Sequence, residues 1–183
     1  MWLMLSAVAP SPAQAATHCE IHFTVEVTQG VGLIRPGTIL TGVAEYTETG
    51  RSFRQEGGST AHVAVGEMRL GDGIRGPIWT LITSANSPSS DMVGVYARDV
   101  EGFSFAGRDF AGPMALTLFG RAGSRDAPVP PTTQDDWDSL DLRRAFALYA
   151  EGADMLAGDV TMLQFECLCE CPRGLTRKAH SGS

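Results

Sequence analysis

Apolar and polar residues alternate along much of the chain, and this alternation predicts β-strands. The clearest example covers residues 19–28, where Ile21, Phe23, Val25 and Val27 are separated by polar residues. Successive side chains of a strand point to opposite sides, so one side of this segment faces a core and the other faces solvent. Further strands are predicted over residues 38–48, 61–70, 76–83, 91–98, 102–106, 114–120, 144–150 and 158–168.

Turn residues separate these segments, as in Gly71-Asp72-Gly73, which predicts a hairpin between residues 61–70 and 76–83. The 21 glycines and 10 prolines are consistent with many turns. Residues 84–90 and 123–134 are predicted loops, and residues 134–142 a short helix with acidic residues in its first turn. The predicted fold class is therefore all-β, an antiparallel β-sandwich (jelly-roll-like) of about eight or nine strands.

The N-terminal residues resemble a secretory leader. An apolar run over residues 2–9 is followed by Ala13-Gln14-Ala15, a cleavage pattern that makes Ala16 the first mature residue. The alternative is a buried N-terminal strand, because no basic residue precedes Trp2. We therefore divide the chain into a signal peptide (1–15), a β-sandwich domain (16–171) and a disordered tail (172–183). This division predicts a periplasmic or extracellular protein without a membrane span.

Export gives the four cysteines, Cys19, Cys167, Cys169 and Cys171, a first interpretation as disulfide partners. Cys19 opens the first predicted strand and the others end the last one, so we expect Cys19 to pair with Cys167 or Cys169. Zinc is the less favoured alternative, because ligands two residues apart on a straight strand splay too far to surround one ion.

Charge and candidate chemistry narrow the function. The net charge of −7 disfavours nucleic acids and anionic lipid surfaces as partners. His18, Glu20 and His22 share one side of the first strand, but the strand separates the two histidines by about 13 Å, too far for one metal ion. The acidic segment 135–141 could bind calcium, although helix capping explains it equally well.

The nearest approach to a nucleophile motif is Gly102-Phe103-Ser104-Phe105-Ala106, which lacks the final glycine of G-x-S-x-G and lies in a strand pattern. Phe103 and Phe105 are therefore predicted to pack in the core. No cofactor motif, metal site or catalytic set emerges, and the sequence favours a non-catalytic protein.

Two segments carry a resemblance to a known group of proteins. Gly37-Thr38-Ile39-Leu40-Thr41-Gly42 and Gly158-Asp159-Val160-Thr161-Met162-Leu163 are similar to paired strands of secreted bacterial β-sandwich proteins of the PEP-CTERM type. The resemblance implies an exported sandwich without catalytic activity. The chain departs from that group after Cys171, where it has no Pro-Glu-Pro motif, apolar anchor or closing arginine run.

The function predicted from these observations is an exported binding protein, or an envelope or matrix protein, with an unknown protein or carbohydrate partner. One alternative is a β-barrel carrier of a small apolar ligand, and another is a glycan-active hydrolase with two carboxyl groups about 5–9 Å apart. The cavity of a carrier would be lined by the aromatic residues of the central strands: Trp79, Tyr96, Phe103, Phe105, Phe110 and Phe119.

Overall fold

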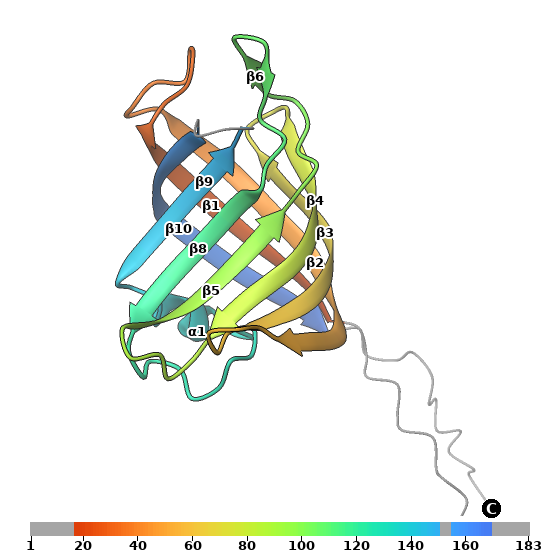
Figure 1. Ribbon diagram of the computed structural model, residues 1–183, viewed down its shortest axis with the longest axis vertical. Helices are drawn as coiled ribbons and strands as arrows, with labels where there is room; N and C mark the ends of the chain where they lie inside the picture. Colours follow the sequence, from red (N-terminus) through yellow and green to blue (C-terminus); the bar gives the residue numbers. More distant parts are fainter. Residues whose placement is uncertain (1–16, 151–154, 170–183) are drawn as a thin grey trace, which may run out of the picture.

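The computed structural model describes residues 17–150 and 155–169, and eight of its strands form one closed antiparallel barrel (Figure 1). Their order around the barrel is β1-β10-β9-β8-β5-β4-β3-β2. The strands are β1 (Thr17–Gln29), β2 (Ile39–Arg54), β3 (Thr60–Leu70), β4 (Ile74–Ser84), β5 (Ser90–Ala97), β8 (Met114–Arg121), β9 (Arg143–Tyr149) and β10 (Met155–Cys169). The remaining described elements are a small hairpin of β6 (Ser104–Phe105) and β7 (Arg108–Asp109), and the helix α1 (Gln134–Asp138).

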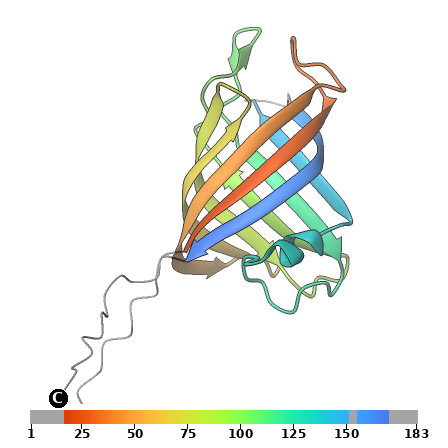
Figure 2. The ribbon, with the colours of Figure 1, turned by 180° about the vertical axis from the view of Figure 1, so that it is seen from behind.

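Closure of the sheet distinguishes this fold from the predicted sandwich. β1 pairs antiparallel with both β2 and β10, so that the first and last strands are neighbours (Figure 2). The prediction of an all-β antiparallel fold with one short helix is confirmed, but the two-sheet sandwich is not. Alternation cannot separate the two folds, because a sandwich and a barrel both bury one side of every strand.

Most predicted strands lie where the pattern placed them, with two differences. The strand predicted over residues 38–48 is longer than expected, because β2 resumes its pairing with β3 at Ser52 after a register shift and continues to Arg54. The predicted strand over residues 102–106 shrinks to the two residues of β6. The predicted hairpin at Gly71-Asp72-Gly73 is confirmed, and it joins Leu70 of β3 to Ile74 of β4.

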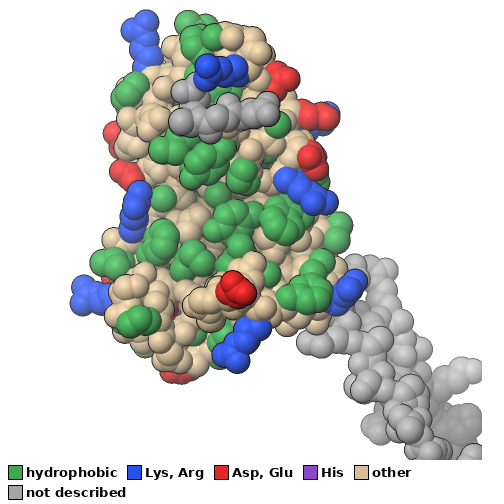
Figure 3. All heavy atoms as spheres, in the orientation of Figure 1, with side chains coloured by type: hydrophobic (Ala, Val, Ile, Leu, Met, Phe, Trp, Pro, Cys, Tyr) green, Lys and Arg blue, Asp and Glu red, His purple; other side chains and the backbone are tan. Residues whose placement is uncertain are grey.

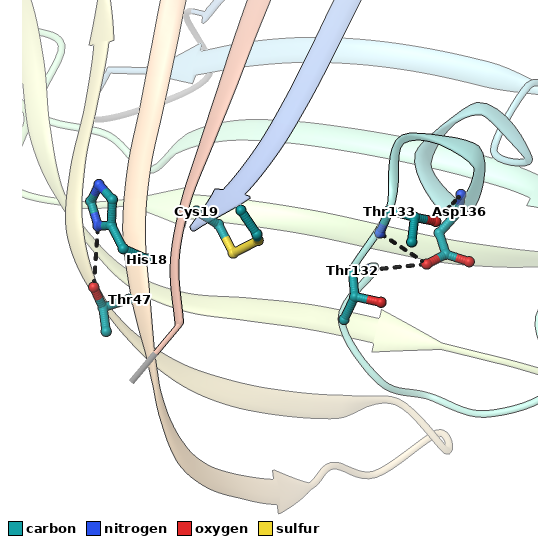
Figure 4. Close-up of a disulfide and its surroundings, with 7 residues drawn as sticks. His18, Cys19, Thr47, Thr132, Thr133 and Asp136 are labelled. Carbon is teal, nitrogen blue, oxygen red and sulfur yellow. Dashed lines mark hydrogen bonds between the residues drawn. A yellow bond between two sulfur atoms is a disulfide. The ribbon is translucent and has the colours of Figure 1, made fainter. Parts of the chain in front are cut away.

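A disulfide joins the two strands that close the barrel. Cys19 and Cys167 are direct partners in the β1–β10 ladder and are bonded to each other across a sequence separation of 148 residues. Figure 4 shows the bridge on the inner side of these strands, at the end of the barrel that carries α1. Of the other two predicted candidates, Cys169 lies opposite Thr17 in the same ladder, and Cys171 lies outside the described residues, as do the predicted signal peptide and tail.

Large apolar side chains fill the barrel interior. Phe23 of β1 and Phe146 of β9 stack with ring centroids 6.0 Å apart, and a close approach at Gly42 makes room for Phe23, since a Cβ there would come within 2.3 Å of its ring. The other fully buried apolar side chains include Ile21, Met68, Leu70, Leu81, Met114, Leu116 and Leu118. Burial of this size supplies the main stabilisation of the fold.

Helix α1 covers one end of the barrel. Its N-terminus is fixed by a capping box, in which Thr133 and Asp136 each accept a hydrogen bond from the backbone of the other. β9 pairs with β10 only as far as Asp159. Beyond that point the Gln134 side chain accepts a hydrogen bond from the Phe165 backbone N–H (2.7 Å) and donates one to the Leu163 carbonyl (3.3 Å). The helix thus satisfies strand backbone that β9 leaves unpaired.

The predicted helix over residues 134–142 is correct in position but too long. Ser139 caps it, and Leu140, which the pattern placed on the helix, is buried in the barrel core beyond the helix end. Among the described residues, no helix has the length and apolar character needed to cross a membrane.

The aromatic residues proposed as a cavity lining do not lie together. Phe103 and Phe110 pack against the core with ring centroids 4.8 Å apart. Phe105, predicted to be in the core, lies on the projecting β6–β7 hairpin and is 49% exposed. Trp79, Tyr96 and Phe119 belong to the outside of the barrel, because their neighbours along each strand are the buried interior residues. The prediction of an aromatic-lined interior cavity is therefore wrong for these residues.

Candidate functional site

A groove of about 490 Å³ lies on the outside of the barrel, over β1, β2, β3 and β10. Its polar lining includes His22, Thr41, Arg69, Gln164 and Glu166, and Val43 and Met162 add apolar surface. These side chains alternate with interior residues such as Phe23 and Phe165, so the same alternation that builds the core places them outside. The groove thus combines hydrogen-bond donors and acceptors with a limited apolar area.

Ion pairs hold several of these polar side chains in place. Arg69 pairs with Glu45 of the adjacent strand and lies 3.8 Å from Glu67. His22 Nε2 lies 2.5 Å from Glu20 Oε1. All of these side chains are at least a third exposed, and exposed pairs contribute little to stability. Their main effect is to fix the positions of donors and acceptors along the groove.

A second hollow of about 320 Å³ adjoins the groove at the β3–β4 hairpin and shares Arg69 and Gly71 with it. It contains three carboxylates, Glu67, Asp72 and Glu101. Glu101 is paired with Arg75 at 3.9 Å and its side chain is 74% exposed. A glycosidase acid requires a site that shields one carboxyl group from water and raises its pKa. This open, arginine-paired arrangement does not supply such a site.

The residues weighed as metal ligands have other roles. His62 lies on β3, where its Nε2 contacts Thr83 (3.0 Å) and the Pro128 carbonyl (3.1 Å). Asp136 of the acidic segment accepts hydrogen bonds from the backbone of Thr132 and Thr133, and these bonds hold its pKa below the ordinary value (Figure 4). Within the described ranges, no three or more His, Cys, Asp or Glu side chains are arranged so that they could hold a metal ion.

The loops at the α1 end are organised by a buried carboxylate that the sequence pattern did not reveal. Asp91 is fully buried and accepts hydrogen bonds from the backbone of Ser87 and Arg125 and from the Ser124 hydroxyl. The Arg125 side chain in turn donates to the Val129 carbonyl at 2.5 Å. Asp91 lies at the start of a predicted strand. Nothing in the sequence indicated that it would accept hydrogen bonds from Ser124 and Arg125, which lie more than thirty positions away.

Inside the same end of the barrel, Glu48 follows the buried Tyr46 on the inner side of β2. Burial raises the pKa of the Glu48 carboxyl group above its ordinary value of 4.5. Burial also raises the pKa of the Tyr46 hydroxyl group, and the negative charge of the nearby Glu48 carboxylate adds to this shift. Burial also lowers the pKa of His62, whose Nε2 carries the proton in the neutral ring because it faces the Pro128 carbonyl.

We expect Glu48→Gln to stabilise the protein at neutral pH. A carboxyl group whose pKa is raised on folding gives stability that is complete below its unfolded pKa and is lost as the pH rises through its folded pKa. The substitution should therefore raise the urea midpoint at pH 7 and have no such effect at pH 4. Glu45→Gln, on the outer side of the same strand, is the matched control and should give no gain. A lower midpoint for Glu48→Gln at pH 7 would contradict this assignment.

Comparison with protein families, curated proteins and solved structures finds no match to this chain. The resemblance of two segments to secreted β-sandwich proteins therefore stays a prediction. The groove residues were also not identified from the sequence, because they come from four strands and become neighbours only when β1 pairs with β10 and β2.

Proposed function

We propose that this protein is an exported, non-catalytic binding protein whose groove over β1, β2, β3 and β10 accepts a neutral carbohydrate. The groove itself carries the proposal, because its lining places Gln164, Thr41 and His22 beside Val43 and Met162. Sugars present hydroxyl groups around an apolar ring surface, and such a mixed lining suits both parts. The Cys19–Cys167 disulfide agrees with an oxidising, extracytoplasmic location.

The charge of this side of the barrel selects against anions. Outward positions of β1 and β2 carry Glu20, Glu26 and Glu45, and Asp159 and Glu166 extend the acidic surface onto β10. Arg69 is already paired with Glu45 and also lies 3.8 Å from Glu67. Phosphate-bearing or uronic-acid ligands would be repelled, whereas a neutral glycan carries no such penalty.

A carrier of apolar ligands receives no support from the closed barrel. The interior positions hold Phe23, Phe146, Met68 and Leu118, all of them buried, where such a ligand would have to lie. Filled interiors of this kind are usual for eight-stranded barrels.

The test is binding of the purified, oxidised protein to an array of neutral and acidic oligosaccharides, followed by calorimetry with each oligosaccharide that binds. We expect binding to neutral members only, and at least a tenfold loss of affinity in Gln164→Ala and Met162→Ala, each of which removes a lining side chain that β10 contributes to the groove. Thr24→Ala, on the same side of β1 but outside the groove lining, is the control and should bind as the wild type does. Binding to acidic members only, no binding, or wild-type affinity in both groove variants would refute the proposal.

A further inference from the structure

The outside of the barrel has two chemically different sides. The outward positions of β1 are all polar, from His18 through Glu20 and His22 to Thr28. The outward positions of β5, β8 and β9 between Met92 and Tyr96, Ala115 and Phe119, and Ala145 and Tyr149 contain no charged residue. Figure 3 shows this second side, on which hydrophobic side chains cover the middle and charged ones lie mostly toward the margins.

The strand sequences themselves indicate a second buried surface. β1 alternates strictly between apolar and polar residues, as expected for a strand with one buried side. By contrast, β8 contains the nearly continuous run Met-Ala-Leu-Thr-Leu-Phe, and β9 contains Ala-Phe-Ala-Leu-Tyr. Runs of this kind are typical of strands that are buried on both sides. The barrel core covers only one of these two sides, and the other faces outward.

Large side chains lie on one half of this apolar side, and small side chains lie in the middle of the other half. The β4–β5 half carries large side chains, Trp79, Ile82 and Tyr96, and Trp79 is 43% exposed. In the middle of its strands the β9–β10 half carries small ones, Ala145, Ala147 and Ala157, while the pair Tyr149 and Met155 lies at one end and Asp159 lies opposite Ala145. Between the halves runs β8, with Thr117 at its centre.

Rows of paired residues align the two halves. Tyr96 lies in one row with Ala115, Ala147 and Ala157, because each is the ladder partner of the next. Thr117 lies in the next row, between Gly94 and Ala145. In the Tyr96 row, the large residue on one side of β8 therefore has small residues at the same level on the other side.

We infer that this apolar side packs against the same side of a second copy of the chain, around a two-fold axis that runs along β8. Such an axis places β5 of one copy over β9 of the other, and β4 over β10, without changing the level along the strands. Tyr96 would then lie over Ala147 of the second copy, and Trp79 would lie toward Ala157. In this row the large residues of each copy fill the space above the small residues of the other, which is the self-complementarity that a two-fold interface requires.

The size of this side fits such a contact. Five strands spaced by about 4.8 Å, with outward rows over about 20 Å of each strand, give a footprint of roughly 500 Å² before side-chain relief is counted. This is of the order that each partner contributes to a small specific interface. The proposed carbohydrate groove lies over β1, β2, β3 and β10, so the contact leaves most of its lining open.

Sedimentation velocity of the purified, oxidised chain with its leader removed tests the inference. We expect a dimer at micromolar concentration. Thr117→Arg would place two arginines against each other at the axis, and we expect it to weaken dimerisation by about a hundredfold or more. Circular dichroism and thermal unfolding would show that the variant is still a folded barrel, because Thr117 points away from the core.

Two further variants locate the contact on the barrel surface. Ala147→Trp should also disrupt the dimer, because it fills the space assigned to Tyr96 of the second copy. Thr24→Arg, on the polar side, should leave the dimer intact. A wild-type monomer at up to about 100 µM, or a dimer that persists in both Thr117→Arg and Ala147→Trp, would overturn the inference. Loss of the dimer in Thr24→Arg instead would move the interface to the polar side and refute it equally.

Discussion

Removal of the Cys19–Cys167 disulfide should lower the free energy of unfolding by about 2–5 kcal/mol. The bond joins residues 148 positions apart, and in the chain-entropy model a loop of that length corresponds to about 5 kcal/mol, through restriction of the unfolded chain. Total stabilities of domains are about 5–15 kcal/mol, so this single bond accounts for a large share. Both cysteines should be replaced together, as Cys19→Ala with Cys167→Ala, because a single replacement leaves a thiol that can form other bridges.

Urea unfolding of the oxidised wild type and the double variant measures this difference, and peptide mapping without reductant confirms the bridge. Cys169→Ala is the matched control, since it changes a neighbouring cysteine of the same strand and leaves the Cys19–Cys167 pair intact. We expect its midpoint to stay close to that of the wild type. Equal midpoints for the wild type and the double variant would show that the bridge does not constrain the unfolded chain.

Trp137→Ala should destabilise the barrel by about 3–5 kcal/mol, the usual range for truncating a fully buried tryptophan. Trp137 is the largest fully buried side chain described, and its ring packs against Phe165 with centroids 5.6 Å apart. It connects α1 to β10 at the point where β9 no longer pairs with that strand. Its loss would open a cavity under the helix and weaken the cover over this end of the barrel.

Trp137→Phe separates packing from hydrogen bonding in this prediction. The indole Nε1 of Trp137 is buried without a hydrogen-bond partner among the described residues, so phenylalanine should keep much of the packing and lose no hydrogen bond. We expect Trp137→Phe to cost clearly less than Trp137→Ala in the same denaturant titration. If the two variants were equally unstable, the side chain would act through its indole nitrogen and not through its volume.

The strands could be predicted because their alternation is a local property. β1 and β3 match the expected ranges within two residues at each end. The positions of the cysteines in the first and last strands predicted a bridge from Cys19 to Cys167 or Cys169, and the structure has Cys167 as the partner. The closed barrel could not be predicted in the same way. Whether β1 also pairs with β10 depends on the curvature of the whole sheet, and no short pattern records that curvature.

The outward positions of Trp79, Tyr96 and Phe119 show a second limit. We placed these aromatic residues inside because large apolar side chains are most often buried. The argument neglected the alternation in their own strands, where Val95 and Leu118 already occupy the inner side. The groove was missed for a different reason, because exposed residues such as Gln164 and Arg69 have no distinctive spacing in the sequence.

Pairing of the first strand with the last also decides when the barrel can form. During synthesis, β2 becomes available to β1 early, but the other edge of β1 stays unpaired until β10 has emerged about 150 residues later. Contacts this distant in sequence slow folding, because the chain must close a long loop before it gains the contacts. An exposed strand edge also invites pairing with other chains. The side chains that flank this edge, Glu20, His22 and Glu26, are charged or polar, and they protect the waiting strand from wrong partners until the barrel closes.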